Sequence, residues 1–112
     1  MGGTHESMAH ADPRYWEVER WVRLFATSHA KRVSPRIEVF LETEGDRIGK
    51  SYGLRLVVGP LYQPPMGSPP LELLFQEISA NRLTLAWCDR LAREIRRQAT
   101  LLMERETTSK SA

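Results

Sequence analysis

The chain has 112 residues, a length typical of one domain and too short for two ordinary ones, so a single hydrophobic core is expected. Hydrophobic residues make up 41% and charged residues 27%, which is typical of a globular protein and excludes a disordered or fibrous one. The net charge of +2 permits a polyanionic partner but does not require one.

The N-terminal segment, residues 1–11, is expected to be disordered. Its first seven residues, MGGTHES, precede a second methionine, Met8, and resemble a vector remnant. Nothing in this segment resembles the apolar core of a secretion signal, and no apolar run approaches the roughly 18 to 20 residues that cross a bilayer. The single cysteine, Cys88, excludes an intramolecular disulfide. We therefore expect a cytoplasmic protein that does not contact a membrane.

The first predicted element is a helix from about Pro13 to His29. Asp12 is a favoured N-cap residue, and proline is well tolerated at the next position. Ser34-Pro35 prevents continuation, because the residue before a proline is pushed toward extended geometry. One apolar face follows the helical period and is expected to join the core: Val18, Trp21, Val22 and Phe25.

Two antiparallel strands are predicted next, over 36–43 and 52–58. Apolar and polar residues alternate in both, and the intervening segment holds Gly45 and Gly49, as expected of a hairpin. Phe40 breaks the alternation in the first strand, because it falls on the polar face. We expect it to meet a second apolar surface.

Residues 59–70, GPLYQPPMGSPP, contain five prolines and two glycines and are predicted to form a surface loop. A third strand is predicted over 71–78. Residues 82–87 favour a fourth strand, because Leu83, Leu85 and Trp87 alternate with other residues. The competing interpretation is one long helix from about Ala80 to Arg105.

The C-terminal helix is predicted from Cys88 to Met103, followed by a disordered tail over 106–112. The fold class expected for residues 12–105 is α+β in one domain. In this arrangement both helices cover one face of an antiparallel meander of three or four strands. The apolar stripe of the last helix consists of Leu91, Ala92, Ile95, Ala99 and Leu102.

Four arginines make the last helix locally basic and are candidates for contacts with nucleic-acid phosphates: Arg90, Arg93, Arg96 and Arg97. Asp89 and Glu94 are interleaved with them and neutralise part of this charge. A solvated helix face is therefore the stronger interpretation of these arginines.

Candidate partner-binding residues are Trp16, Phe40, Tyr62 and Met66. Tyr62 and Met66 lie in the proline-rich loop, whose backbone loses little entropy on docking. Trp16 lies off the main apolar stripe of the first helix. Together with Phe40 it indicates a second apolar surface, of the kind that is often buried against another chain.

No catalytic constellation, metal site or cofactor site is predicted. His5, His10 and His29 are scattered along the chain, and no nucleophile, base and orienting group can be assembled from the pattern. We therefore predict that the protein is not an enzyme and that it needs no cofactor.

Two resemblances add to this interpretation. Asp12-Pro13-Arg14-Tyr15-Trp16-Glu17, followed by Trp21-Val22-Arg23-Leu24-Phe25, resembles small uncharacterised proteins of high-GC proteobacteria such as the Burkholderia group. This resemblance implies a domain of unknown function after Met8 and transfers no site residue. The α-β-β-β-α order resembles the double-stranded RNA-binding fold, whose lysine-rich helix start is only partly matched by Asp89-Arg90-Leu91-Ala92-Arg93.

The sequence thus predicts a non-catalytic binding or assembly module whose partner is another protein or a second copy of the chain. A homodimer is plausible, because an antiparallel sheet of this size leaves an uncovered edge. The alternative is nucleic-acid binding through the arginines of the last helix.

Overall fold

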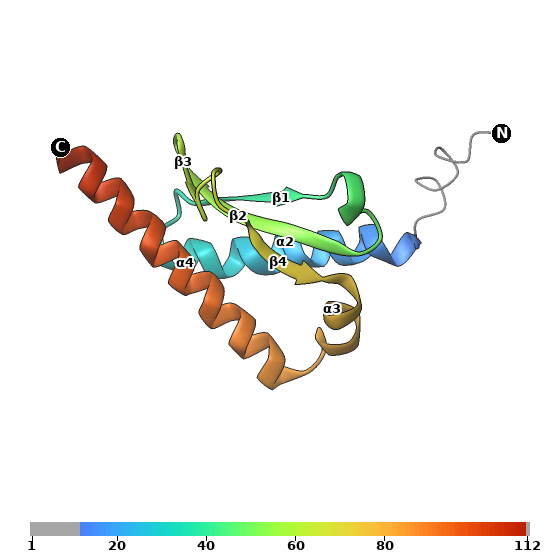
Figure 1. The fold of residues 1–112 in the computed structure, drawn as a ribbon. Helices are drawn as coiled ribbons and strands as arrows, with labels where there is room; N and C mark the ends of the chain where they lie inside the picture. Colours follow the sequence, from blue (N-terminus) through green and yellow to red (C-terminus); the bar gives the residue numbers. More distant parts are fainter. Residues whose placement is uncertain (1–11, 112) are drawn as a thin grey trace.

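A computed structural model describes residues 12–111 and confirms the α+β class, with two long helices on one face of an antiparallel sheet (Figure 1). The first helix, α2, spans Pro13–Val33, four residues beyond the predicted end. The Asp12 side chain accepts a hydrogen bond from the backbone N–H of Arg14 at 2.9 Å, which confirms the N-cap. Ser34, immediately before Pro35, is extended and ends the helix.

The predicted hairpin is confirmed, and its second strand is the centre of the sheet. Strand β1 (Glu38–Glu42) pairs antiparallel with β2 (Ser51–Val58), with Phe40 opposite Arg55 and Leu41 opposite Leu54. A short 3₁₀ helix, η1 (Gly45–Arg47), lies between them. Because side chains alternate along a strand, Leu41 and Leu54 face the helices while Phe40 and Arg55 face the opposite side.

The third row of the sheet consists of two short strands in place of one. Both β3 (Leu61–Gln63) and β4 (Leu71–Leu74) pair antiparallel with β2, β3 along residues 56–58 and β4 along residues 51–54. The prediction that all of 59–70 is a loop is therefore wrong over 61–63. The C-terminal helix, α4 (Leu85–Ser111), holds this strand: Gln98 accepts a hydrogen bond from Gln63 at 2.8 Å, and Arg105 donates to the Tyr62 carbonyl.

The predicted third strand is correct only in its first half. The chain leaves β4 at Leu74 and forms a short helix, α3 (Phe75–Asn81). Phe75 and Ile78 are three residues apart and both are buried, a spacing that one helical turn satisfies and a strand does not. Burial of this pair therefore overrides the apolar run that suggested a strand.

The predicted fourth strand over 82–87 is wrong. A turn follows α3, and a helix, α4, spans Leu85–Ser111. The backbone N–H of Cys88 donates to the Thr84 carbonyl at 3.0 Å, so the helical bonding begins at Thr84. The competing single helix from Ala80 is not formed either, because the turn over 82–84 separates α3 from α4.

The C-terminal tail expected from residue 106 is helical through Ser111. Glu106 is buried, and its carboxylate accepts two hydrogen bonds from the Arg36 guanidinium, at 3.2 and 2.7 Å. This long-range pair ties the last turns of α4 to the segment that follows α2. The two residues are 70 positions apart in the chain, so the polar sequence of the tail alone does not predict this contact.

The core lies between the sheet and the two long helices, which contact each other and run obliquely to one another (Figure 1). Buried residues of α2 recur every three or four positions. The apolar core residues of β2 recur every second position from Tyr52 to Val58, and the alternate residues from Ser51 to Arg55 are buried as well. The largest fully buried side chains are Tyr15, Tyr52, Ile37, Leu54, Leu56, Ile78, Ile95, Leu102, Val18 and Val22.

Candidate functional site

The sheet face opposite α2 and α4 is the candidate site, and we call it the open face. By strand alternation and register it is formed by every second residue of each strand. It therefore carries charged, aromatic and aliphatic side chains: Glu38, Phe40, Glu42, Ser51, Gly53, Arg55, Val57, Tyr62, Glu72 and Leu74.

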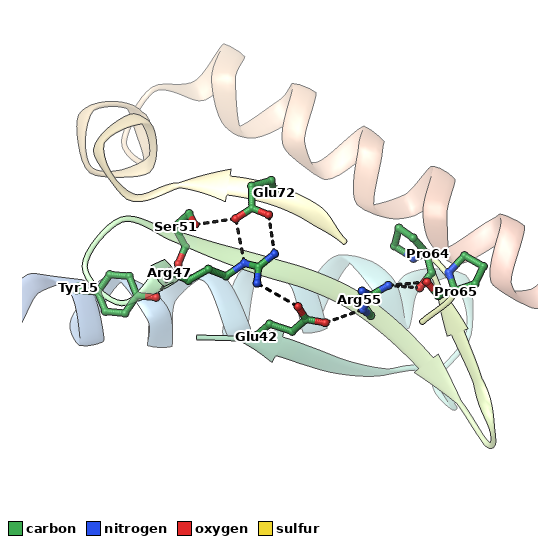
Figure 2. Close-up of polar contacts among 8 residues, drawn as sticks. All are labelled: Tyr15, Glu42, Arg47, Ser51, Arg55, Pro64, Pro65 and Glu72. Carbon is green, nitrogen blue, oxygen red and sulfur yellow. Dashed lines mark hydrogen bonds and ion pairs between the residues drawn. The ribbon is translucent and has the colours of Figure 1, made fainter. Parts of the chain in front are cut away.

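A network of two arginines and two glutamates spans the open face (Figure 2). Arg47, just after the first strand, binds Glu72 through Nε and Nη2, at 3.0 and 2.9 Å. Its Nη1 lies 3.3 Å from Glu42, which in turn accepts a hydrogen bond from Arg55 at 2.7 Å. The four charges cancel, so this part of the face has no net attraction for an anion or a cation.

Glu72 is held as a carboxylate by its neighbours. The Arg47 guanidinium lowers the pKa of Glu72 by hydrogen bonding. Burial opposes this shift, and a hydrogen bond from the Ser51 hydroxyl at 2.7 Å lowers the pKa further. The same pair raises the pKa of Arg47. Neither group is poised to exchange a proton near neutral pH, so the network is suited to holding strands together and is unsuited to acid-base chemistry.

Arg55 fastens the proline-rich segment to the open face. Only 4% of its surface is exposed, and its Nη1 donates to the carbonyl oxygens of Pro64 and Pro65 at 2.9 and 2.7 Å (Figure 2). Farther along the segment, Pro70 lies over Gly53: a Cβ added at Gly53 would be 2.8 Å from Pro70 Cγ. The loop is therefore packed against the sheet at both ends.

Two of the predicted partner-binding residues meet on this face. Phe40 of β1 and Tyr62 of β3 form an edge-to-face pair with ring centroids 5.8 Å apart, and Phe40 is 39% exposed. Met66 follows Pro65 in the loop that Arg55 holds, and it is exposed. Phe40, Tyr62 and Met66 thus belong to one side of the sheet.

Trp16 is the exception among the predicted partner-binding residues. It lies on α2, in the helical layer, where its ring contacts Tyr15 at a centroid distance of 4.8 Å. Phe40 is on the opposite side of the sheet. The expected common surface of Trp16 and Phe40 is therefore not formed, because strand alternation turns Phe40 away from the layer that contains α2.

The four candidate nucleic-acid-binding arginines are separated into two groups. Arg90, Arg93 and Arg97 are exposed on the outer side of α4. Arg93 pairs with Asp89 at 2.6 Å and Arg97 with Glu94 at 2.7 Å, which partly neutralises this side. Arg96 is half-buried and faces α2, where its Nη1 lies 3.0 Å from His29 Nδ1.

Several exposed leucines escaped the sequence interpretation. Leu83 and Leu85, expected to alternate in a strand, are 95% and 85% exposed around the turn before α4, and Leu24 on α2 is 65% exposed. Leucine is usually a core residue, and nothing in the neighbouring sequence distinguishes these three leucines from buried ones. In the part of the chain that the structure describes, no three metal-binding side chains gather, and no helix is long and apolar enough to cross a membrane.

Comparison with known proteins adds no assignment: no protein-family model matches the chain, and no curated protein or solved structure is significantly similar to it.

Proposed function

We propose that the chain is a non-catalytic assembly module that pairs with a second copy of itself through β1 and the aromatic pair of the open face. The observation that carries this proposal is the position of Phe40. It is the third of the five residues of β1, it is 39% exposed, and its ring contacts Tyr62. An exposed aromatic ring that packs on a half-buried second ring is the type of surface that protein interfaces favour.

The free edge of β1 supports this mode of assembly. Within residues 12–111, β1 pairs with β2 on one side, and no strand pairs with its other edge. The backbone N–H and C=O groups of such an edge can accept another strand. A second β1 is the partner of matched length, and symmetric dimers are the commonest assemblies of identical chains.

A two-fold antiparallel pairing centred on Phe40 places the two Phe40 side chains opposite each other on the same face. Cross-strand neighbours have Cβ atoms about 4.5 to 5.5 Å apart, close enough for ring contact. The same pairing brings Glu38 near Glu42 of the other copy. Each of these carboxylates already has a cation in its own chain, Lys31 at 3.2 Å from Glu38 and Arg55 at 2.7 Å from Glu42.

The charge distribution favours a protein partner over a polyanion at this face. Arg47 and Arg55 are both directed at glutamates, so neither offers an uncompensated charge to a phosphate. We therefore expect self-association that changes little between low and physiological salt.

The experiment is a measurement of mass in solution over a concentration series, comparing the wild type with Phe40→Ala and Trp16→Ala. Trp16 is the matched control because it is an equally exposed aromatic, 42% against 39%, outside the proposed interface. Phe40→Ala is expected to raise the dimer dissociation constant at least tenfold, since central aromatics dominate interface energies. Trp16→Ala should leave it within about twofold of the wild type.

Far-UV circular dichroism on the same samples establishes that both variants are folded. A wild type that stays monomeric up to about 100 μM, a concentration at which an interface of about 5 kcal/mol would be visible, contradicts the proposal. An equal loss of dimer in both variants contradicts the assignment of the interface to β1.

Nucleic-acid binding is the second candidate function, and one observation favours it. Arg90, Arg93 and Arg97 share the exposed side of α4, and Arg90 makes no ion pair within the described residues. Combined Arg93→Glu and Arg97→Glu substitutions should abolish binding to labelled RNA duplex if this side contacts phosphates, and the affinity should fall steeply with salt. Absence of binding at low salt excludes this candidate.

A further inference from the structure

A groove of about 370 Å³ is lined by residues of α2 and α4 and combines cationic with apolar side chains. Arg32 of α2 and Arg96 of α4 are the cationic side chains, and His29 of α2 lies beside Arg96. Phe25, Leu85 and Ala92 supply apolar surface to the same groove. The groove is on the helical side of the molecule, so it is separate from the open face.

Two arginines of this groove have no carboxylate partner among the residues that the structure describes. Neither Arg32 nor Arg96 forms an ion pair with any carboxylate in residues 12–111. Asp89 also lines the groove, but its carboxylate is engaged by Arg93 at 2.6 Å. Half-buried arginines elsewhere are held by the chain: Arg47 pairs with Glu72, Arg82 pairs with Glu17, and Arg105 donates to the Tyr62 carbonyl and to Gln63. The two groove arginines therefore have donors left for a ligand.

His29 carries a third hydrogen-bond donor. A guanidinium can only donate hydrogen bonds, so the contact between Arg96 Nη1 and His29 Nδ1, at 3.0 Å, requires a lone pair on Nδ1. The neutral ring then carries its proton on Nε2. Burial, followed by the charges of Arg32 and Arg96, lowers the pKa of His29, and the groove also presents Asp89 and Cys88 to this region.

We infer that this α2–α4 groove binds a small organic anion, a phosphate or carboxylate attached to an apolar body, through Arg32, Arg96 and His29. Forked guanidinium donors match the oxygens of either head group. The apolar body lies against Phe25 and Leu85, as in other sites where a few polar groups orient a largely apolar ligand. This inference does not depend on self-association through β1.

The first test is an NMR titration of the full chain with phenyl phosphate, with benzoate and inorganic phosphate in separate arms. We expect saturable shifts of groove amides with phenyl phosphate or benzoate, and the tighter of the two identifies the head group. Inorganic phosphate should bind more weakly because it lacks the body. Equal affinity for inorganic phosphate, or no saturation below about 10 mM, where binding is worth under 3 kcal/mol, overturns the inference.

Matched variants distinguish specific binding in the groove from non-specific electrostatic attraction to the positively charged surface. Arg32→Gln and Arg96→Gln should each weaken binding about tenfold or more, the loss typical of a charged hydrogen bond. Arg90, on the outer side of α4, makes no ion pair within residues 12–111, and Arg90→Gln should change the affinity less than twofold. An equal effect of all three variants overturns the inference. Arg32 is exposed, so its substitution tests the site even if Arg96→Gln lowers the stability of the fold.

The ring of His29 supplies a second readout. In the free protein, ¹⁵N shifts should show the proton on Nε2, and saturation with phenyl phosphate should raise the pKa of His29 because the anion offsets Arg32 and Arg96. An unchanged pKa of His29 at saturation overturns the placement of the anion. Tighter binding of a single-stranded oligonucleotide than of phenyl phosphate, lost in Arg32→Gln, would reassign the groove to nucleic acid.

Discussion

The Tyr52 hydroxyl donates a hydrogen bond to the backbone carbonyl oxygen of Tyr15 at 2.6 Å, while the two rings stack with centroids 4.6 Å apart. The Tyr15 hydroxyl in turn donates to the carbonyl oxygen of Ser51 at 2.6 Å. Both side chains are fully buried. These reciprocal contacts join the first turn of α2 to the start of β2, and they are the main polar contacts inside an otherwise apolar core.

Tyr52→Phe is expected to lower the free energy of unfolding by about 1 to 2 kcal/mol, because it removes a buried hydrogen bond without removing the ring. Tyr62→Phe is the matched control, since the Tyr62 hydroxyl makes no hydrogen bond within the described residues. It should cost less than about 0.5 kcal/mol. Chemical denaturation measures both changes in the free energy of unfolding. Equal changes in the two variants would show that the buried Tyr52 hydroxyl stabilises the fold no more than the Tyr62 hydroxyl does.

Stability should fall in alkaline solution because of the same two residues. Burial, with a smaller contribution from Glu19, raises the pKa of Tyr15 to about 12, and burial also raises the pKa of Tyr52. In the unfolded chain both hydroxyls ionise near pH 10. The stabilisation is therefore complete below pH 10 and is lost as the pH rises toward and through the folded-state values.

The measurement is the free energy of unfolding between pH 8 and 12 for the wild type and for a Tyr15→Phe, Tyr52→Phe double variant. The wild type should lose stability with pH in this window, and the double variant should lose less. If the free energy of unfolding falls equally with pH in both proteins, groups other than these two tyrosines cause the loss of stability.

Gly53→Ala should destabilise the fold by about 1 to 3 kcal/mol, as overpacking in a closed site does. The new Cβ would lie 2.8 Å from Pro70 Cγ and 3.0 Å from Arg47 Nε, so the loop or the network must move. Gly67→Ala is the control, because nothing lies within 4 Å of a Cβ at that position. Thermal unfolding compares them. Equal stability of the two variants would show that Pro70 is not packed on Gly53.

Arg36→Ala should loosen the end of α4, because it removes the two hydrogen bonds that hold the buried Glu106 carboxylate. The Arg36 side chain is 53% exposed, so solvent screens the pair and the global loss of stability should be small. Hydrogen exchange should accelerate over residues 103–109 and stay unchanged near Leu91. Arg93→Ala, which breaks a pair within α4, should leave exchange at 103–109 unaffected.

Local sequence patterns were enough to predict the helices and strands whose apolar spacing fits only one kind of secondary structure. The N-cap at Asp12 and the alternation of residues 52–58 depend on neighbours in the chain, and the structure confirms α2 and the hairpin. The prediction failed where two periods fit the same residues. Leu83, Leu85 and Trp87 alternate as in a strand, while Trp87, Leu91 and Ile95 keep a helical spacing, and burial of Leu91 and Ile95 decided in favour of α4.

The candidate sites could be predicted only in part. Phe40 and Tyr62 were recognisable as candidate partner-binding aromatics, but their contact depends on the register of β1, β2 and β3. The groove between α2 and α4 could not be anticipated, because His29 and Arg96 are 67 residues apart. Their approach follows from the packing of both helices on one face.

Apolar periodicity, capping residues and composition therefore determined the α+β class, the single core and the first hairpin, because these depend on short-range sterics and on the burial of one face. Tertiary structure decided the split of the third strand, the start and end of α4, the separation of Trp16 from Phe40, and the charges that remain unpaired. Each of these features depends on contacts between residues far apart in the chain. Such contacts stabilise the fold by more than the local helix and strand propensities on which a prediction from sequence rests.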